Sequence, residues 1–274
     1  MRNYQDRVAV ITGGASGIGS SLCRTLGANQ ATVIVTDIDI EGAEKTARAI
    51  IESGGQAKAV LLDVTQAADV QAVLNEVAAE FGRIDYLFNN AGIGIAGEMH
   101  DIDIAQWRRI MDINLLGVIY GASIAYSFML QQGSGHIINV SSLAGLIGYP
   151  TATPYATTKS AIVGMSLSLR EEAADSGVKI SVACPGFVQT DFFDSATLLH
   201  AKKEDILQQI PFSMMSADQA AQAILRGVEN NRGIIIFPFY ARLLWWLYRI
   251  HPLLIRPVAR KIVQDFRRVK QKSQ

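Results

Sequence analysis

Apolar residues recur along the chain in short unbroken runs that alternate with longer stretches of helical period. Runs rich in β-branched residues lie at 8–12, 32–36, 57–63, 85–89, 136–141, 179–184 and 233–237. Helical period is found between them, at 18–28, 42–53, 70–81, 107–130, 156–176 and 217–230. Strands that are apolar throughout and alternate with helices indicate a parallel sheet covered on both faces. The pattern therefore predicts an α/β doubly wound fold of the Rossmann type, with about seven strands and helices on both faces.

The pattern continues past the last predicted strand into a basic extension, residues 240–274. We expect a single catalytic domain at 1–239, followed by this helical extension, which Pro252 and Pro257 should divide because proline is disfavoured inside a helix. At 100° per residue, its second half carries an apolar stripe of Val258, Ala259, Ile262, Val263, Phe266 and Val269. The opposite side carries Arg260, Lys261, Gln264, Arg267 and Arg268.

Charge is distributed unevenly, although 25 basic and 25 acidic side chains balance over the 274 residues. From Tyr240 onwards, nine Lys or Arg stand against one acid, Asp265. Apolar stripes, tryptophans and a basic face together favour a helix in the interface of an anionic membrane. The alternative is that the extension packs over a substrate mouth or a partner subunit. We therefore expect a cytoplasmic protein attached peripherally to the inner face of a membrane, with no nucleic-acid partner.

Composition limits the other classes of protein. With 49% hydrophobic and 18% charged residues, the chain is globular and not disordered. Cys23 and Cys184 lie far apart in apolar segments, which predicts free buried thiols. The four histidines show no metal-ligand spacing, so no metal is expected. The first predicted strand follows directly on "MRNYQDR" and no unbroken apolar run is long enough to span a bilayer, so neither a signal peptide nor a membrane span is expected.

The first predicted strand ends in "ITGGASGIGSS", with Gly13, Gly17 and Gly19 before and at the start of a helix. Glycines at this position allow a tight turn, close approach of the backbone to a phosphate, and close packing of helix and strand. The exposed N–H groups and the helix dipole then favour a pyrophosphate. This turn predicts a dinucleotide site at the carboxyl ends of the strands.

Two acidic residues close the next two predicted strands. Asp37 follows Gly19 by 18 residues and would accept hydrogen bonds from a ribose, while repelling a 2′-phosphate. No Arg or Lys follows it directly, which favours NAD over NADP. Asp63 is a weaker candidate for contact with the adenine edge.

The stretch "YATTK" places Tyr155 and Lys159 four residues apart in a predicted helix, so both side chains can act on one small site. A lysine charge there favours the phenolate and lowers the pKa of the tyrosine. The pair could then exchange a proton with an alcohol or ketone near neutral pH.

Six motifs in this order and spacing resemble the short-chain dehydrogenase/reductase family, over residues 5–238. They are "TGGASGIG" at 12–19, "NNAG" at 89–92, Asn114 in "MDINLLG", Ser142 in "INVSSLAG", "YATTK" at 155–159 and "PG" at 185–186. The resemblance implies hydride exchange between a nicotinamide and an alcohol or ketone.

Roles follow from the resemblance residue by residue. Tyr155 would be the general acid/base, Lys159 would hold the nicotinamide ribose, and Ser142, not Ser141, would polarise the carbonyl. Asn114 would keep a water in a proton relay. The cofactor would further contact Gly13, Ser16, Gly17, Ile18, Gly19, Asp37, Asp63, Val64, Asn90, Gly92, Pro185, Gly186, Val188 and Thr190.

The family places its substrate lid at residues 187–215. This stretch carries Phe187, Phe192, Phe193, Leu198, Leu199, Phe212, Met214 and Met215. A second apolar wall is expected from Ile93, Ile95, Leu143, Leu146, Ile147 and Tyr149. Neither stretch has a basic cluster for an anion, so we expect a lipophilic alcohol or ketone resembling a steroid, a retinoid or a fatty chain. The other interpretation is that these residues only pack the lid or a subunit interface.

Two further functions stay open at this point: an NADP-dependent 3-oxoacyl-thioester reductase and a non-catalytic dinucleotide-sensing scaffold. A homodimer or homotetramer is expected through the helices at 107–130 and 156–176.

Overall fold

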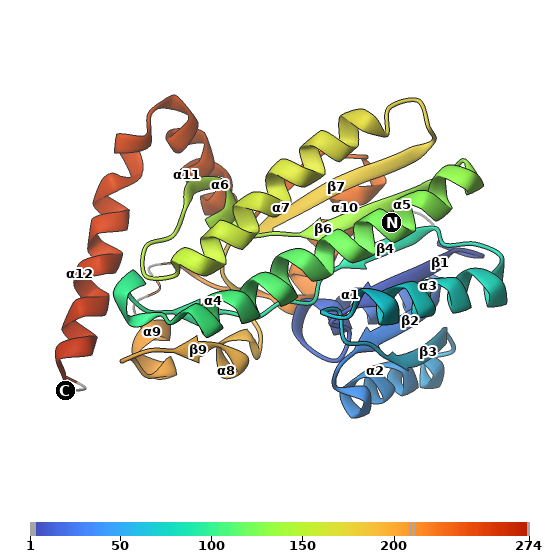
Figure 1. The fold of residues 1–274 in the computed structure, drawn as a ribbon, viewed down its shortest axis with the longest axis horizontal. Helices are drawn as coiled ribbons and strands as arrows, with labels where there is room; N and C mark the ends of the chain where they lie inside the picture. The colour runs from blue at the N-terminus through green and yellow to red at the C-terminus, as the bar shows by residue number, and fades with distance from the viewer. Residues whose placement is uncertain (1–3, 209, 211, 273–274) are drawn as a thin grey trace.

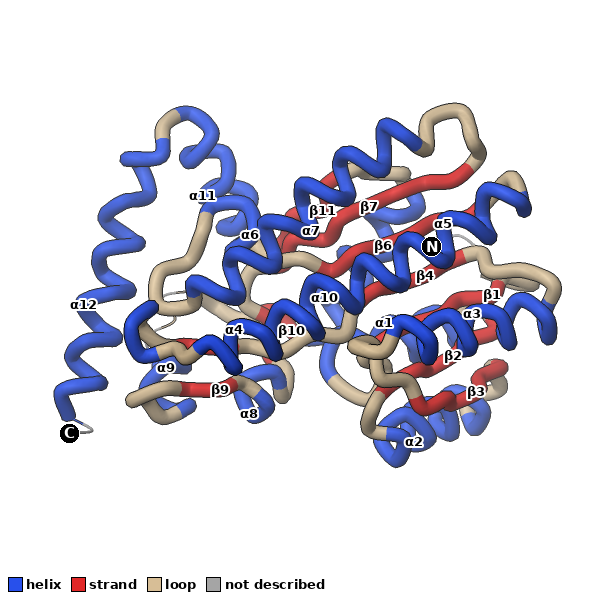
Figure 2. Tube along the Cα trace, viewed as in Figure 1, coloured by secondary structure: helices blue, strands red, loops and turns tan. Residues whose placement is uncertain are grey.

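A computed structural model of the chain describes residues 4–208, 210 and 212–272. Its centre is a parallel sheet of seven strands in the order β11-β7-β6-β4-β1-β2-β3 (Figures 1 and 2). The strands are β1 (Val8–Thr12), β2 (Thr32–Asp37), β3 (Gln56–Leu61), β4 (Tyr86–Asn89), β6 (Gly135–Val140), β7 (Val178–Pro185) and β11 (Ile234–Phe237). The predicted doubly wound fold is confirmed.

Helices cover both faces of this sheet. One face is covered by α1 (Gly17–Ala28), α2 (Ile40–Glu52) and α10 (Ala217–Glu229), whose apolar sides form a single buried cluster with the strands. The other face is covered by α3 (Ala67–Phe81), α5 (Gly117–Gln132) and α7 (Thr153–Glu172). The inner strands are thus enclosed on both sides, which accounts for their unbroken apolar runs, whereas the edge strand β3 is only half-buried.

Two differences from the expected elements have local causes. The helix expected at 107–130 begins at Ile104, because Asp103 and Gln106 form a capping box there. It then runs as α4 (Ile104–Met111), a π-helical turn (Asp112–Leu116) and α5. The third strand ends at Leu61, so Asp63 lies in the following loop and does not close the strand.

Among the described residues, one helix is long and apolar enough to cross a membrane, the continuous stretch Ile104–Gln132. No such span was expected from unbroken apolar runs. In the fold, the apolar side of α5 packs on the sheet, where Ala122, Ala125 and Met129 are buried. Packing on the sheet therefore uses part of its apolar surface, whereas Ile104, Met111 and Leu130 are exposed.

Short elements gather at the carboxyl ends of the strands, on the left in Figure 1. They are β5 (Ile95–Ala96), a 3-10 turn (Met99–Asp101), α6 (Ala144–Ile147), β8 (Val188–Gln189), α8 (Phe192–Ser195), β9 (Thr197–Leu198), α9 (Lys203–Gln208) and β10 (Met215–Ser216). The pairing of β5 with β9 attaches the lid segment to the residues after β4, and the pairing of β8 with β10 brings the two ends of the lid together. Two-residue strands have no readable period, so the sequence pattern missed them.

The extension forms α11 (Phe239–Ile250), a 3-10 turn (Pro252–Ile255) and α12 (Arg256–Lys272). Pro252 separates the two helices as expected, whereas Pro257 lies in the first turn of α12, where a missing N–H is tolerated. Ala241 is buried in a core cluster with Ile236, and Tyr240 accepts a hydrogen bond from the Phe187 N–H at 2.6 Å. The start of the extension is therefore packed into the main body.

Candidate active site

The strand order changes direction between β1 and β4, and the glycine turn lies at that point. Gly13 has φ +67°, and a Cβ there would lie 2.8 Å from Ala91 Cα. A Cβ on Gly19 would lie 1.9 Å from the Gly13 carbonyl oxygen. The turn therefore requires glycine at both positions, and it leaves the N-terminus of α1 facing the cavity. This is a cradle that fits the pyrophosphate of a dinucleotide.

Asn90 fixes this turn from the neighbouring strand. Its Nδ2 donates to the carbonyl oxygens of Thr12 and Gly13, both at 3.0 Å. Asn90 also lines the cavity. The sequence suggested a contact with the cofactor at Asn90, and the structure adds that its amide supports the glycine turn.

Asp37 stands at the end of β2, on the wall of the same cavity. Its Oδ2 accepts from the Ala15 N–H at 2.9 Å and its Oδ1 from the Asp39 N–H at 3.0 Å. The carboxylate is thereby held beside the glycine turn, where an adenosine ribose would lie. Asp63 lies nearby in a turn closed by Thr65, whose N–H and hydroxyl both donate to its Oδ1.

The residues predicted to bind the cofactor are brought together along one side of a cavity of about 1400 Å³. Those lining it are Gly13, Ser16, Gly17, Ile18, Asp37, Asp63, Val64, Asn90, Gly92, Tyr155, Lys159, Pro185, Gly186, Val188 and Thr190. Gly19 is absent from the lining because it packs against the turn itself.

Lys159 is buried at one turn of α7 below Tyr155. Its Nζ donates to the Val140 carbonyl oxygen at 2.9 Å and lies 5.6 Å from the centre of the Tyr155 ring. Burial lowers the pKa of Lys159 to about 8. Lys159 is therefore mostly a charged ammonium at neutral pH, and it lines the cavity. Its contact with a nicotinamide ribose stays a prediction.

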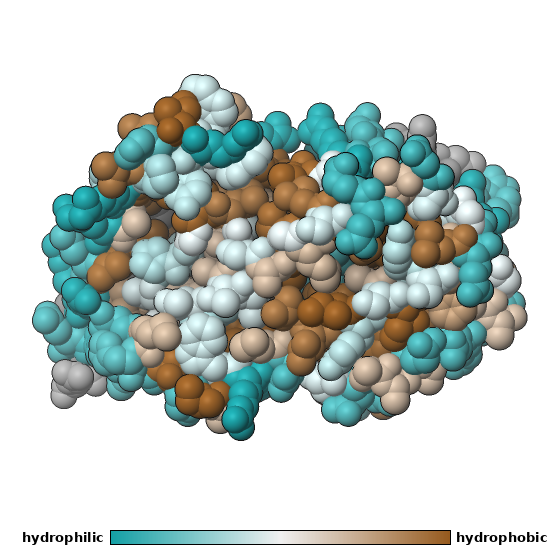
Figure 3. All heavy atoms as spheres, turned by 45° about the horizontal axis from the view of Figure 1, so that its top comes forward, coloured by the Kyte–Doolittle hydropathy of each residue, from teal (hydrophilic) through white to brown (hydrophobic). Residues whose placement is uncertain are grey.

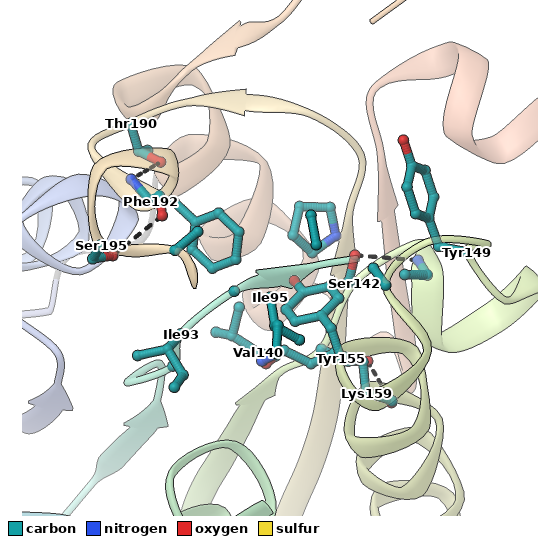
Figure 4. A pocket seen from close by; sticks show the side chains of 18 of the residues that line it. Ile93, Ile95, Val140, Ser142, Tyr149, Tyr155, Lys159, Thr190, Phe192 and Ser195 are labelled. Carbon is teal, nitrogen blue, oxygen red and sulfur yellow. Dashed lines mark hydrogen bonds between the residues drawn. The ribbon is translucent and has the colours of Figure 1, made fainter. Parts of the chain in front are cut away.

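Tyr155 and Ser142 lie side by side in the wall of the cavity (Figure 4). Burial raises the pKa of Tyr155 to about 12, and a hydrogen bond with Ser142 opposes that rise. The sequence predicted that Lys159 lowers this pKa. That prediction is wrong here, because burial raises the pKa and the interaction that opposes the rise comes from Ser142. At neutral pH the phenol therefore keeps its proton and can donate it.

Ser141 and Ser142 are distinguished by their partners. Ser141 is buried and its hydroxyl donates to the Lys159 carbonyl oxygen at 2.7 Å, which ties β6 to α7. Ser142 lines the cavity, where it accepts from the Ala144 N–H at 3.1 Å and forms a hydrogen bond with Tyr155. This geometry favours Ser142 as the hydrogen-bond donor to a substrate oxygen.

Asn114 lies in the π-helical turn and is fully buried. Its Oδ1 accepts from the Ile93 N–H at 2.8 Å and its Nδ2 donates to the Ile93 carbonyl oxygen at 2.9 Å. It does not line the cavity, and its amide holds the loop between β4 and β5 in place. A Cβ on Gly92 would lie 3.2 Å from Asn114 Oδ1 and 3.4 Å from Lys159 Nζ. The role of Asn114 in a proton relay stays a prediction.

Apolar side chains line much of the cavity beside Tyr155. Phe192 lies edge-on to the Tyr155 ring, with 5.7 Å between ring centres (Figure 4). Of the two expected walls, the residues that line the cavity are Phe187, Phe192, Leu198, Phe212, Ile93, Ile95, Leu143, Ile147 and Tyr149.

Four expected wall residues lie elsewhere, and the side chain of Phe193 lies outside the described part of the chain. Leu199 packs under Gly97, while Leu146 and Met215 join core clusters. Met214 is half-buried but does not line the cavity. Apolar character alone could not separate lining from packing.

A third wall has two parts. The sequence pattern missed the first, whereas the second comes from the extension, whose packing over a substrate mouth was one of the expected alternatives. Ile104, Ala105, Arg108 and Arg109 of α4 line the cavity. The extension adds Tyr240, Leu244, Ile255, Val258, Ala259, Ile262 and Phe266. The apolar stripe of the extension was visible in the sequence, but nothing in it indicated what the stripe faces.

Comparison with known proteins agrees with this geometry. The sequence model of the family described as short chain dehydrogenase matches residues 7–200. The chain is 38% identical to cis-4-hydroxycyclohexanecarboxylate dehydrogenase of Sinomonas cyclohexanicum, over 68% of this chain and 75% of the relative. It is 33% identical to cyclohexanol dehydrogenase of an Acinetobacter species, over 84% of this chain and 97% of the relative.

A solved structure has the same fold. It is a short chain dehydrogenase/reductase from Burkholderia phymatum in complex with NAD, with a TM-score of 0.80 and 25% identity over 95% of this chain and 94% of that one. The cradle, the Tyr155–Lys159 pair and these matches lead to one conclusion. The chain belongs to the short-chain dehydrogenase/reductase family of NAD(P)-dependent oxidoreductases that act on alcohol and carbonyl groups.

Proposed function

We propose that the protein is an NAD-dependent dehydrogenase or reductase of a lipophilic alcohol or ketone. One observation carries the proposal: a single cavity runs from the glycine cradle past Tyr155 to an apolar end. Its 1400 Å³ exceeds an ordinary ligand pocket, as a site for both a dinucleotide and a substrate must. The relatives named for cyclohexanol and a hydroxycyclohexanecarboxylate support a substrate with an apolar ring or chain.

The reaction needs two things from the chain: stabilisation of charge on the substrate oxygen and transfer of a proton to or from it. A bound nicotinamide supplies or accepts the hydride. Ser142 and Tyr155 donate two hydrogen bonds to the oxygen on which charge develops. Tyr155 then gives its proton to that oxygen in reduction and takes one in oxidation. The Lys159 ammonium, fixed by Val140, stabilises the phenolate that reduction leaves behind.

Tyr155→Phe should lower turnover by about 100-fold or more, because the proton carrier is lost while the ring is kept. NADH affinity, measured by fluorescence, should stay within about twofold. Thr157→Ala, an exposed change on the same helix, is the matched control and should leave turnover unaltered. Near-normal turnover of Tyr155→Phe would contradict the assigned role.

In the unmutated protein, the rate of alcohol oxidation should rise with pH. Oxidation needs a deprotonated Tyr155 to accept the proton of the alcohol, and burial keeps this phenol protonated at neutral pH.

Apolar secondary alcohols, cyclohexanol among them, should reduce NAD, followed as absorbance of the reduced nicotinamide. Short polyols should react at least about tenfold less efficiently by kcat/KM, because their hydroxyls lose water without finding partners at the apolar end. Activity on polyols without activity on apolar alcohols would reject the substrate class.

NAD should bind more tightly than NADP, since the Asp37 carboxylate repels a 2′-phosphate. Asp37→Asn removes the charge and keeps an acceptor for the Ala15 N–H. It should therefore lower the ratio of the NADPH to the NADH dissociation constant by about tenfold. Dissociation constants of NADH and NADPH, measured by fluorescence for both proteins, provide the test. Equal constants in the unmutated protein would be the contrary result.

We further propose that the protein is a homo-oligomer and that the extension attaches it to an anionic membrane. Exposed apolar side chains on the expected contact helices, Ile104, Met111, Leu130 and Leu167, support the first part. For the second, α11 and the 3-10 turn carry a solvent-facing apolar stripe of Phe239, Leu243, Trp246, Ile250, Leu253 and Leu254. Figure 3 shows apolar atoms among polar ones in this part of the molecule, at its upper left. The stripe of α12 is used inside the protein, so membrane contact is assigned to α11.

The protein should sediment with phosphatidylglycerol-containing vesicles at low salt, and Trp246→Glu should lower this binding at least about tenfold. Ile51→Glu, an equally exposed apolar position on α2, is the control and should sediment as before. Light scattering should give the same dimer or tetramer mass for all three. A smaller mass for Trp246→Glu would make the stripe a subunit contact, and a monomeric unmutated protein would refute the oligomer.

A further inference from the structure

The C-terminal helix α12 lies at the edge of the molecule beside the lid segment (Figure 1), beyond the residues that the family model matches. Val258, Ile262 and Phe266 follow one another at intervals of four residues, so they share one face of the helix. All three line the cavity that contains Tyr155. Phe266 is only 4% exposed, although the helix also carries exposed Arg260 and Lys261. The inner face of α12 is thus built as part of the cavity.

Ion pairs fasten the far end of α12 to the residues after β5. Arg267 donates from Nε to Glu98 Oε1 at 2.8 Å. Lys270 Nζ lies 2.5 Å from Asp101 Oδ2 and 3.5 Å from Glu98 Oε2. Lys270 and Asp101 are largely buried, at 14% and 12% side-chain exposure, and such charge-assisted bonds are stronger than surface pairs. We call these four residues the clasp.

The clasp also explains a group of possible metal ligands. Glu98, His100 and Asp101 bring their ligand atoms within 4.8 Å of one another. The Lys270 ammonium already stands among them, 3.4 Å from His100 Nε2. His200, from the lid, lies 3.5 Å from Asp101 Oδ1. The acidic group therefore joins the lid and α12 around a cation that the chain itself supplies.

We propose that α12 forms the outer wall of the substrate-binding end, that Ile262 and Phe266 determine which apolar substrates fit, and that the clasp holds this wall in place. The inference rests on the proposed lipophilic substrate and assigns its specificity to the extension. A substrate whose reacting oxygen lies at Tyr155 and Ser142 directs its remaining bulk past Phe192 into the apolar end. There the side chains of α12 complete the enclosure that the lid begins.

The wall is tested with the full-length protein, NAD and a series of apolar secondary alcohols of increasing size. Phe266→Ala should raise KM for the larger members about tenfold and leave the smallest unaffected, because only the larger ones reach the lost ring. Ile262→Trp should shift the largest accepted alcohol to a smaller size. Gln264→Ala, on the solvated face of α12, is the control and should change neither. If KM changes equally for alcohols of every size, or changes no more than in the control, the proposed role of α12 as a wall of the substrate site is rejected.

The clasp is tested without any substrate, by hydrogen exchange of the amides of residues 256–272. Glu98→Gln combined with Asp101→Asn should speed their exchange about tenfold or more, while NADH affinity stays unchanged as evidence of an intact fold. Unaltered exchange would overturn the clasp. If the unmutated protein oxidises no apolar alcohol, the proposed substrate class fails, and the exchange experiment still decides how α12 is held. If it oxidises them and the dependence of KM on alcohol size is unchanged in Phe266→Ala and Ile262→Trp, only the proposed role of α12 as a wall is rejected.

Discussion

The reversal of strand order between β1 and β4 determines where the cofactor cradle, the catalytic side chains and the lid can lie. Crossovers from these two strands leave in opposite directions, so their carboxyl ends are the one place in the sheet that no connection covers. The Asn90 amide spans this gap by donating to the carbonyl oxygens of Thr12 and Gly13. The glycine turn is thereby fixed, and α1 can direct its N-terminal N–H groups into a cavity. The catalytic helix and the lid are placed relative to that fixed point.

Burial beside the cavity determines the protonation of Tyr155 and Lys159, and the spacing of the motif does not reveal this effect. The same exclusion of water raises the pKa of Tyr155 to about 12 and lowers that of Lys159 to about 8, because each group is pushed towards its neutral form. The two shifts act together: a phenol that keeps its proton stands beside a cation that is readily stabilised by a new negative charge. The Val140 carbonyl accepts one hydrogen bond from the ammonium, which offsets only part of the cost of burying this charge.

The sequence predicted the features that depend on local physics. Apolar runs gave all seven strands of the sheet, since a strand enclosed on both faces has few polar positions. The glycines, Asp37 and the Tyr155–Lys159 pair were found because each chemistry requires its residue type at a definite position. The sequence did not predict features that depend on contacts between distant segments or on exact strand ends. Asp63 lies in a loop and not at the end of a strand, because strand ends are weakly marked in a sequence. Leu199 and Met215 pack in the interior and do not line the cavity, and the two-residue strands of the lid are too short to show a period.

The C-terminal extension shows the same limit most clearly. An amphipathic stripe indicates that a helix needs an apolar partner, but the stripe is identical whether the partner is lipid, a second subunit or the chain's own cavity. Here the two helices differ: α12 turns Ile262 and Phe266 inwards, whereas α11 leaves Trp246 exposed. Part of the positive charge that suggested a membrane is neutralised within the protein, where Arg267 and Lys270 meet Glu98 and Asp101. Net charge along a segment therefore says less about its partner than the positions of the acids it folds against.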